Sequence, residues 1–285
     1  MSTAYRIILL FFMIVEMSHA FSLNKHHHAP VITAKEMQGA LFIDALSVPS
    51  PQELFTAINK VSRPNWTTFD HAGNAPVTTN RAQLALAIGV FVTNGYMALQ
   101  AEDGQQVKNM GRDMILLSKA LGVSQTILSR GSNLIEFADN HEWKALEYDL
   151  EATENDVKST MITQQDQSLI TLISVGLWLR ALEVGSQIIL NHYSSRGAAL
   201  LREPDLALNL AASMEALPFK LRTDPLVLRA QQTLKEVAAL LTKEKHGLSK
   251  EDLTILEQAT KKIVADITTS NSSIIAPQIA VPIAP

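Results

Sequence analysis

The sequence contains no cysteine among its 285 residues. This absence excludes disulfide bonds, thiolate metal sites, a cysteine nucleophile and a lipid-modified N-terminal cysteine. Because an exported chain of this length can bury a large core without disulfides, the absence fits the bacterial periplasm or cell surface better than a small extracellular domain. A eukaryotic secretory origin is the alternative, and it would make Asn65 and Asn271 the first residues of glycosylation sequons.

Basic charge, glycine and aromatic residues are also scarce. The chain has 24 Lys and Arg against 28 Asp and Glu, which gives a net charge of −4. This balance argues against a nucleic-acid-binding protein, which normally has a basic face. With 12 glycines, 11 prolines and 6% aromatic residues, the composition also lacks the turn and β-branched clusters typical of sheet proteins.

Sequence motifs for catalysis are missing as well. There is no Gly-x-Ser-x-Gly elbow and no glycine-rich phosphate loop. The one Glu-x-x-His pair, Glu16 to His19, lies in the N-terminal segment and not in a bundle helix, where such a pair could bind a metal. We therefore predict no catalytic residue, no metal site and no cofactor.

Residues 1–20 have the pattern of a secretory signal peptide. Arg6 provides the positive charge, Ile7 to Val15 form an apolar run too short to cross a bilayer, and Ser18 and Ala20 place small residues before the expected cleavage point. We expect cleavage after Ala20, with an uncleaved N-terminal anchor as the alternative. Residues 21–33 form a polar leader, expected to be disordered, whose His26, His27 and His28 would hold a transition metal only weakly.

The rest of the chain shows helical spacing of apolar residues and no alternating strand pattern. The spacing predicts an all-α fold, a multi-helix bundle of roughly ten antiparallel helices with short loops. Residues 34–269 form a single helical domain in this interpretation, and residues 270–285 a flexible tail rich in Pro, Ile and Ala. The expected helices are about 34–47, 51–61, 79–103, 104–121, 124–140, 142–165, 169–193, 205–217, 225–243 and one from 249. Ser124 and Asp166 are expected to cap the helices that they precede, and Ser249 with Asp252 to form a capping box in which Asp replaces Glu.

Two of these segments, 79–103 and 169–193, are apolar around nearly the whole helix circumference. Such helices are usually buried on all sides. A transmembrane helix at 84–101 is the alternative, but Thr93, Asn94 and Gln100 interrupt its apolar run. We therefore expect no stable membrane span after cleavage of the signal peptide.

Polar residues within the two apolar helices are the first candidates for a site. Arg180 and Glu183 share one helix face, and Asn94 is the equivalent residue in the other helix. Because a buried charge is tolerated only when it is paired and hydrogen-bonded, these residues either line a ligand pocket between the helices or form an internal ion pair. In the second case the partner of Arg180 is Glu183, or the pair Glu102 and Asp103.

The loop at 62–78 is the other candidate. Trp66 and Phe69 are either anchors for a partner protein or rings that fold back onto the bundle. Asp70 and His71 are adjacent there and suggest an alternative function, a hydrolase-type enzyme that uses them as acid and base. Replacing His71 with Ala would distinguish the two, because an enzyme would lose turnover without losing its fold.

Three stretches, Arg81–Gly89, Ala101–Asp103 and Leu117–Val123, resemble an uncharacterised family of exported all-helical bacterial proteins. The resemblance covers residues 79–195 and implies the bacterial envelope, but it brings no activity and no site residues. We expect an exported helical protein of the bacterial cell envelope, periplasmic or secreted, that binds a partner protein or a small ligand without catalysis. Nucleic acid is not an expected partner.

Overall fold

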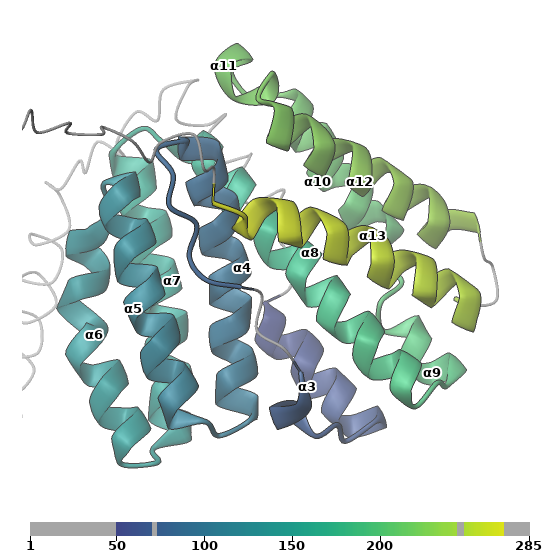
Figure 1. Ribbon diagram of the computed structural model, residues 1–285, viewed down its shortest axis with the longest axis horizontal. Helices are drawn as coiled ribbons and strands as arrows, with labels where there is room; N and C mark the ends of the chain where they lie inside the picture. The colour runs from purple at the N-terminus through teal and green to yellow at the C-terminus, as the bar shows by residue number, and fades with distance from the viewer. Residues whose placement is uncertain (1–49, 70–72, 244–247, 271–285) are drawn as a thin grey trace, which may run out of the picture. The chain divides into compact units, whose positions relative to one another are not determined.

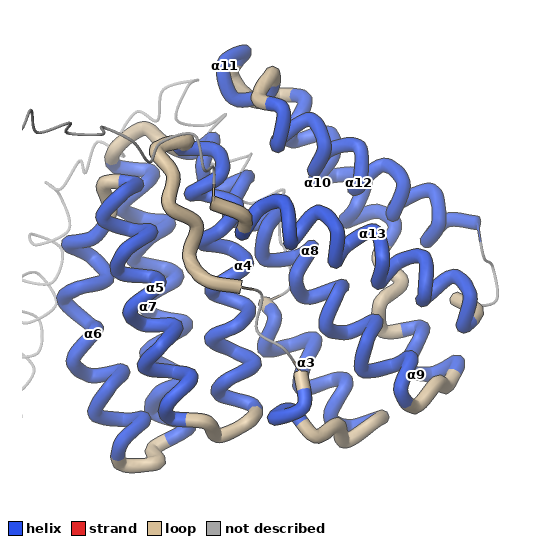
Figure 2. The backbone as a smooth tube through the Cα atoms, viewed as in Figure 1, coloured by secondary structure: helices blue, strands red, loops and turns tan. Residues whose placement is uncertain are grey.

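Helices make up the regular structure of this protein, and no strand occurs in the residues described (Figures 1 and 2). The computed structural model describes residues 50–69, 73–243 and 248–270, all within one compact unit, 46–285. The elements are α3 (Pro51–Val61), the 3-10 helix η1 (Trp66–Thr68), α4 (Arg81–Gln100), α5 (Gly104–Leu121), α6 (Ser124–Asp139), α7 (Trp143–Thr163), α8 (Gln167–Asn191), α9 (Ser195–Ala199), α10 (Pro204–Glu215), α11 (Phe219–Arg222), α12 (Pro225–Lys243) and α13 (Lys250–Thr268).

The predicted all-α, multi-helix bundle is confirmed, and most predicted helix bounds agree with the observed ones within a few residues. Antiparallel packing of sequence neighbours stays a prediction. Sequence spacing did not predict η1, α9 or α11, because a helix of three to five residues is too short to show a period. The signal segment, the leader, the helix expected at 34–47 and residues 271–285 of the tail lie outside the described residues.

Capping side chains explain where several helices begin. Ser50 and Glu53 form a capping box before α3, and Ser249 and Asp252 form the predicted one before α13. Asn80 caps α4 by accepting hydrogen bonds from the amides of Ala82 and Gln83. These contacts satisfy amides that have no partner within the first turn.

Two expected caps differ from the structure. Asp166 precedes α8, but its carboxylate makes no cap hydrogen bond and instead pairs with Arg81 at 2.7 Å. The prediction that Asp166 caps α8 through its side chain is therefore wrong, because the nearby guanidinium of Arg81 takes the carboxylate. At α6 the N-cap position belongs to Val123, and Ser124 is the first helical residue.

The helices α4 and α8 form the centre of the core. They cross so closely that a Cβ atom added at Gly89 would overlap the carbonyl oxygen of Ile173, and one added at Gly176 would overlap that of Leu86. Thr93 donates a hydrogen bond across the crossing to the carbonyl oxygen of Leu177 at 3.1 Å. Glycine is required at this crossing because any side chain would separate the two backbones.

Both central helices are long and apolar enough to cross a membrane by length and composition. Inside the protein, however, 94% of the most apolar stretch of α4 and 89% of that of α8 are buried. The predicted burial on all sides is therefore confirmed for both helices.

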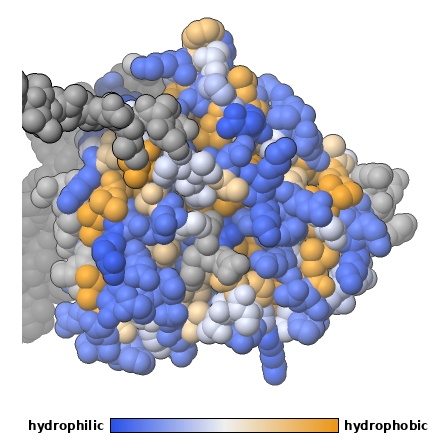
Figure 3. Space-filling model, in the orientation of Figure 1, coloured by the Kyte–Doolittle hydropathy of each residue, from blue (hydrophilic) through white to orange (hydrophobic). Residues whose placement is uncertain are grey.

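The other helices surround this central pair. Helices α5, α6 and α7 lie side by side next to α4, and α13 packs along α8 with α12 and α10 beyond it (Figure 1). Helix α3 contacts both α4 and α8. On the face seen in Figure 3, hydrophilic residues cover much of α12 and α13, with hydrophobic residues scattered among them.

Candidate functional site

Arg180 and Glu183, the first pair that the sequence singled out, lie between α4 and α8 and are paired with each other. Their side chains approach at 2.8 Å, and Arg180 is 3% exposed and Glu183 7% exposed. The Nε atom of Arg180 donates a hydrogen bond to Oδ1 of Asn94 at 2.9 Å, and its Nη2 contacts the sulfur of Met97 at 3.7 Å. The ion-pair interpretation with Glu183 as partner is confirmed.

The buried pair leaves some polar atoms without a hydrogen bond. Nδ2 of Asn94 has none, and Oε2 of Glu183 lies at ion-pair distance from Nη1 of Arg180 without hydrogen-bond alignment. The two charges still attract each other at 2.8 Å, because charge attraction depends weakly on the N–H direction. Removing one member of such a pair would leave the other charge buried and uncompensated.

Trp66 and Phe69 fold back onto the bundle. Each is 7% exposed, and the indole ring of Trp66 packs between Phe55 of α3, at 4.8 Å between ring centroids, and Phe69, at 6.1 Å. This corresponds to the second interpretation offered by the sequence. Neither ring is an exposed contact anchor as the structure stands.

A chain of side-chain hydrogen bonds starts at Trp66 and connects η1, α3, α4 and α7. Nε1 of Trp66 donates to Asn59 at 2.8 Å, and Asn59 donates to Gln100 at 2.6 Å. Gln100 donates to Gln52 at 3.0 Å, and Gln52 donates to Oε1 of Glu147 at 2.7 Å. In the sequence, Gln100 interrupts the apolar run of its helix. Its hydrogen bonds with Asn59 and Gln52 explain why a polar residue occupies this position.

The donor-to-acceptor direction of these hydrogen bonds is set by the groups at the two ends of the series. An indole N–H can only donate, so it requires the oxygen of Asn59 to face it, and this choice fixes the orientation of each following amide. At the other end, an ionised carboxylate can only accept. The carboxylate of Glu147 is thus held in one position by a polar network in which each link is satisfied.

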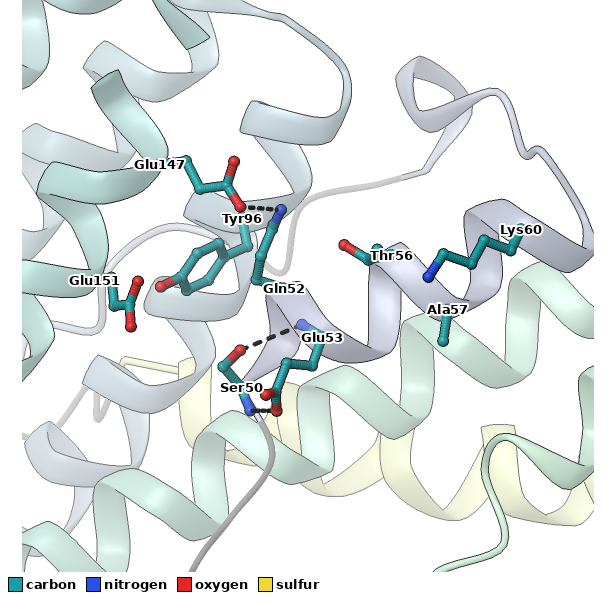
Figure 4. A pocket seen from close by; sticks show the side chains of 9 residues that line it. All are labelled: Ser50, Gln52, Glu53, Thr56, Ala57, Lys60, Tyr96, Glu147 and Glu151. Carbon is teal, nitrogen blue, oxygen red and sulfur yellow. Dashed lines mark hydrogen bonds between the residues drawn. The ribbon is translucent and has the colours of Figure 1, made fainter. Parts of the chain in front are cut away.

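A pocket of about 480 Å³ lies next to this network, between α3, α4 and α7. Its volume is in the range of small-molecule sites. Figure 4 shows its lining residues, which are Ser50, Gln52, Glu53, Thr56, Ala57, Lys60, Tyr96, Glu147 and Glu151. Arg180, Glu183 and Asn94 do not line it.

Tyr96 is the buried polar residue of the pocket. It is 2% exposed, and no group in the described part of the chain hydrogen-bonds to its hydroxyl. In Figure 4 the hydroxyl points toward Glu151. Burial raises the pKa of the Tyr96 hydroxyl well above its usual value, and the nearby charges of Glu154, Glu151 and Glu147 raise it further. The hydroxyl is therefore a neutral group that is available to a ligand.

The acidic residues around the pocket differ in their partners. Glu53 closes the capping box of α3, and Glu154 pairs with Lys158 at 2.7 Å. For Glu147 and Glu151 the described residues provide no ion-pair partner within 4.0 Å. The pocket therefore carries uncompensated negative charge on its α7 wall.

The sequence did not predict this pocket, although one signal was present. Glu147, Glu151 and Glu154 share one face of α7 at helical spacing, an arrangement of like charges that weakens an isolated helix. The alternative site at Asp70 and His71 lies outside the described residues. Among the residues described, no group of three or more metal-ligating side chains is placed to hold a metal ion.

Comparison of the chain with protein-family models, with curated proteins and with solved structures finds no match. The case for a function therefore depends on the residues themselves.

Proposed function

We propose that the protein is an exported, non-catalytic binding protein of the bacterial cell envelope that holds a small ligand in the pocket between α3, α4 and α7. The observation that carries this proposal is the Tyr96 hydroxyl. The Tyr96 residue is 2% exposed, its hydroxyl opens into the pocket, and no described residue hydrogen-bonds to that hydroxyl. A polar group that reaches into a pocket without a protein partner is of the kind that orients a ligand there.

The polar network beside the pocket also supports a binding role. The hydrogen bonds from Trp66 through to Glu147 hold the α3 and α7 walls in place before any ligand arrives. A site arranged in advance loses less conformational entropy on binding, so it gains affinity. The signal-like N-terminus supports export, and the absence of cysteine fits an envelope location.

A pocket-filling substitution tests this proposal. Ala57 lines the pocket, whereas Ala239 is exposed on α12, so Ala57→Phe fills the cavity and Ala239→Phe is the matched control. The full sequence would be expressed in an exporting host, and the purified protein examined by native mass spectrometry. We expect a small molecule on the wild type and on Ala239→Phe, and none on Ala57→Phe at an unchanged melting temperature.

Two results would overturn the proposal. One is a bound molecule that persists on a folded Ala57→Phe variant, which would place the ligand elsewhere. The other is an unliganded wild type that also gains no thermal stability from any compound of a chemically diverse small-molecule set.

A further inference from the structure

The charges on the pocket walls indicate what kind of ligand fits. Glu147 and Glu151 contribute two carboxylates without ion-pair partners in the described residues. Lys60 is the one basic residue of the lining, and it forms no ion pair within 4.0 Å among the residues described. These carboxylates would repel an anion and attract a cation.

The same walls favour an organic cation over a metal ion. The described residues place no three metal-ligating groups together. Ca²⁺ takes six to eight oxygen ligands at short distance, and the two carboxylates on the α7 wall do not provide such a set. An ammonium group needs fewer partners, and it forms charge-assisted hydrogen bonds with carboxylates.

We propose that the pocket binds an organic amine, whose ammonium group is held by Glu147 and Glu151 and by the Tyr96 hydroxyl. This inference rests on the binding role proposed above and specifies the ligand class. Oε1 of Glu147 accepts from Gln52, which leaves its second oxygen for the ligand. The neutral hydroxyl of Tyr96 accepts an N–H without adding charge, and Ala57 offers an apolar surface for an alkyl chain.

The proposal is tested with three probes of similar length and different charge, which are putrescine, butanediol and succinate. Isothermal titration calorimetry of each into the purified full chain measures the affinity. We expect putrescine to bind, and to bind more weakly as salt is added, because ion pairing is screened. Butanediol and succinate should bind at least about tenfold more weakly.

Charge-neutral variants locate the site. Glu147→Gln keeps an oxygen that accepts the hydrogen bond of Gln52, so it removes the charge and preserves the network. Glu151→Gln removes the second carboxylate, and Glu136→Gln on the exposed face of α6 is the matched control. We expect Glu147→Gln and Glu151→Gln each to weaken putrescine binding by about tenfold, and Glu136→Gln to leave it unchanged.

The results distinguish a failure of the amine inference from a failure of the proposed binding role. If butanediol or succinate binds as tightly as putrescine, or if both pocket variants bind putrescine like the wild type, the amine inference is overturned and the binding role stands. If no probe binds but Ala57→Phe still displaces a natural ligand, the ligand is not an amine of this kind. If no probe binds and no natural ligand is found, both proposals are overturned.

Discussion

At the scale of single residues, Tyr96 combines deep burial with a cluster of negative charge. Its hydroxyl has no partner in the described residues, and three glutamates on α7 contribute to the shift of its pKa. In a folded protein such a phenol keeps its proton to a higher pH than it does in the unfolded chain. Its ionisation is therefore coupled to unfolding.

This coupling predicts a pH-dependent effect of Tyr96→Phe. An unfolded tyrosine loses its proton near pH 10, so above about this pH the unfolded state binds fewer protons than the folded state and stability falls as the pH rises. The fall ends once the pH passes the raised pKa of Tyr96. Urea unfolding should show similar midpoints for wild type and Tyr96→Phe at about pH 8, and a higher midpoint for Tyr96→Phe at about pH 11.

Tyr148→Phe is the matched control, because Tyr148 lies on α7 and is 73% exposed. This variant should follow the wild type at both pH values. If Tyr96→Phe also follows the wild type at high pH, burial and the nearby glutamates do not raise the pKa of Tyr96 in the folded protein.

Arg180 provides a second prediction for single residues. Arg180→Met leaves Glu183 buried without its cation, and we expect a loss of about 3–5 kcal/mol in the free energy of unfolding. The double variant Arg180→Met/Glu183→Leu removes both charges and should recover much of this loss. Asn94 loses the hydrogen bond from Arg180 in both variants. The difference between their free energies of unfolding, measured in urea, therefore reports the cost of the unpaired charge of Glu183. Equal instability of the two variants would contradict this account.

At the scale of elements, sequence spacing and capping residues predicted most of the helices. Ser249 and Asp252 form the expected capping box, and both apolar helices lie in the core. Asp166 occupies the expected N-cap position of α8, but its side chain does not cap the helix, because it pairs with Arg81 of α4, and this neighbour does not appear in the local sequence. Neighbouring residues in the sequence therefore predict a helix and its cap well, unless a residue distant in the sequence binds the capping side chain.

The crossing of α4 and α8 leads to a prediction about glycine. Gly89→Ala inserts a methyl group against the backbone of α8, and we expect a loss of about 1–3 kcal/mol or more in unfolding free energy. Gly95→Ala is the matched control in the same helix, because its added Cβ would meet nothing within 4 Å. Since alanine favours a helix over glycine by about 1 kcal/mol, Gly95→Ala should be neutral or stabilising.

Chemical denaturation of both variants checks this pair. Equal stability of Gly89→Ala and Gly95→Ala would show that the two backbones can separate at little cost.

At the scale of the whole molecule, the fold class could be predicted and the pocket could not. A bundle follows from composition and periodicity, which are properties of short windows. The pocket depends on Gln52 and Glu147, which are 95 residues apart and hydrogen-bonded to each other. The sequence noted the loop aromatics and Gln100 separately, but only the packing of α3 on α4 and α7 connects them into one network.

The glycine crossing also fixes how the helices are aligned along one another. Gly89 and Gly176 must meet, because a shift of α8 by one residue along α4 would bring the side chain of Val175 or Leu177 against the α4 backbone. One alignment of the central pair is therefore strongly preferred. Helix α5 packs on α4, and α13 packs on α8. Gly89 and Gly176 therefore also influence where these outer helices lie along the molecule.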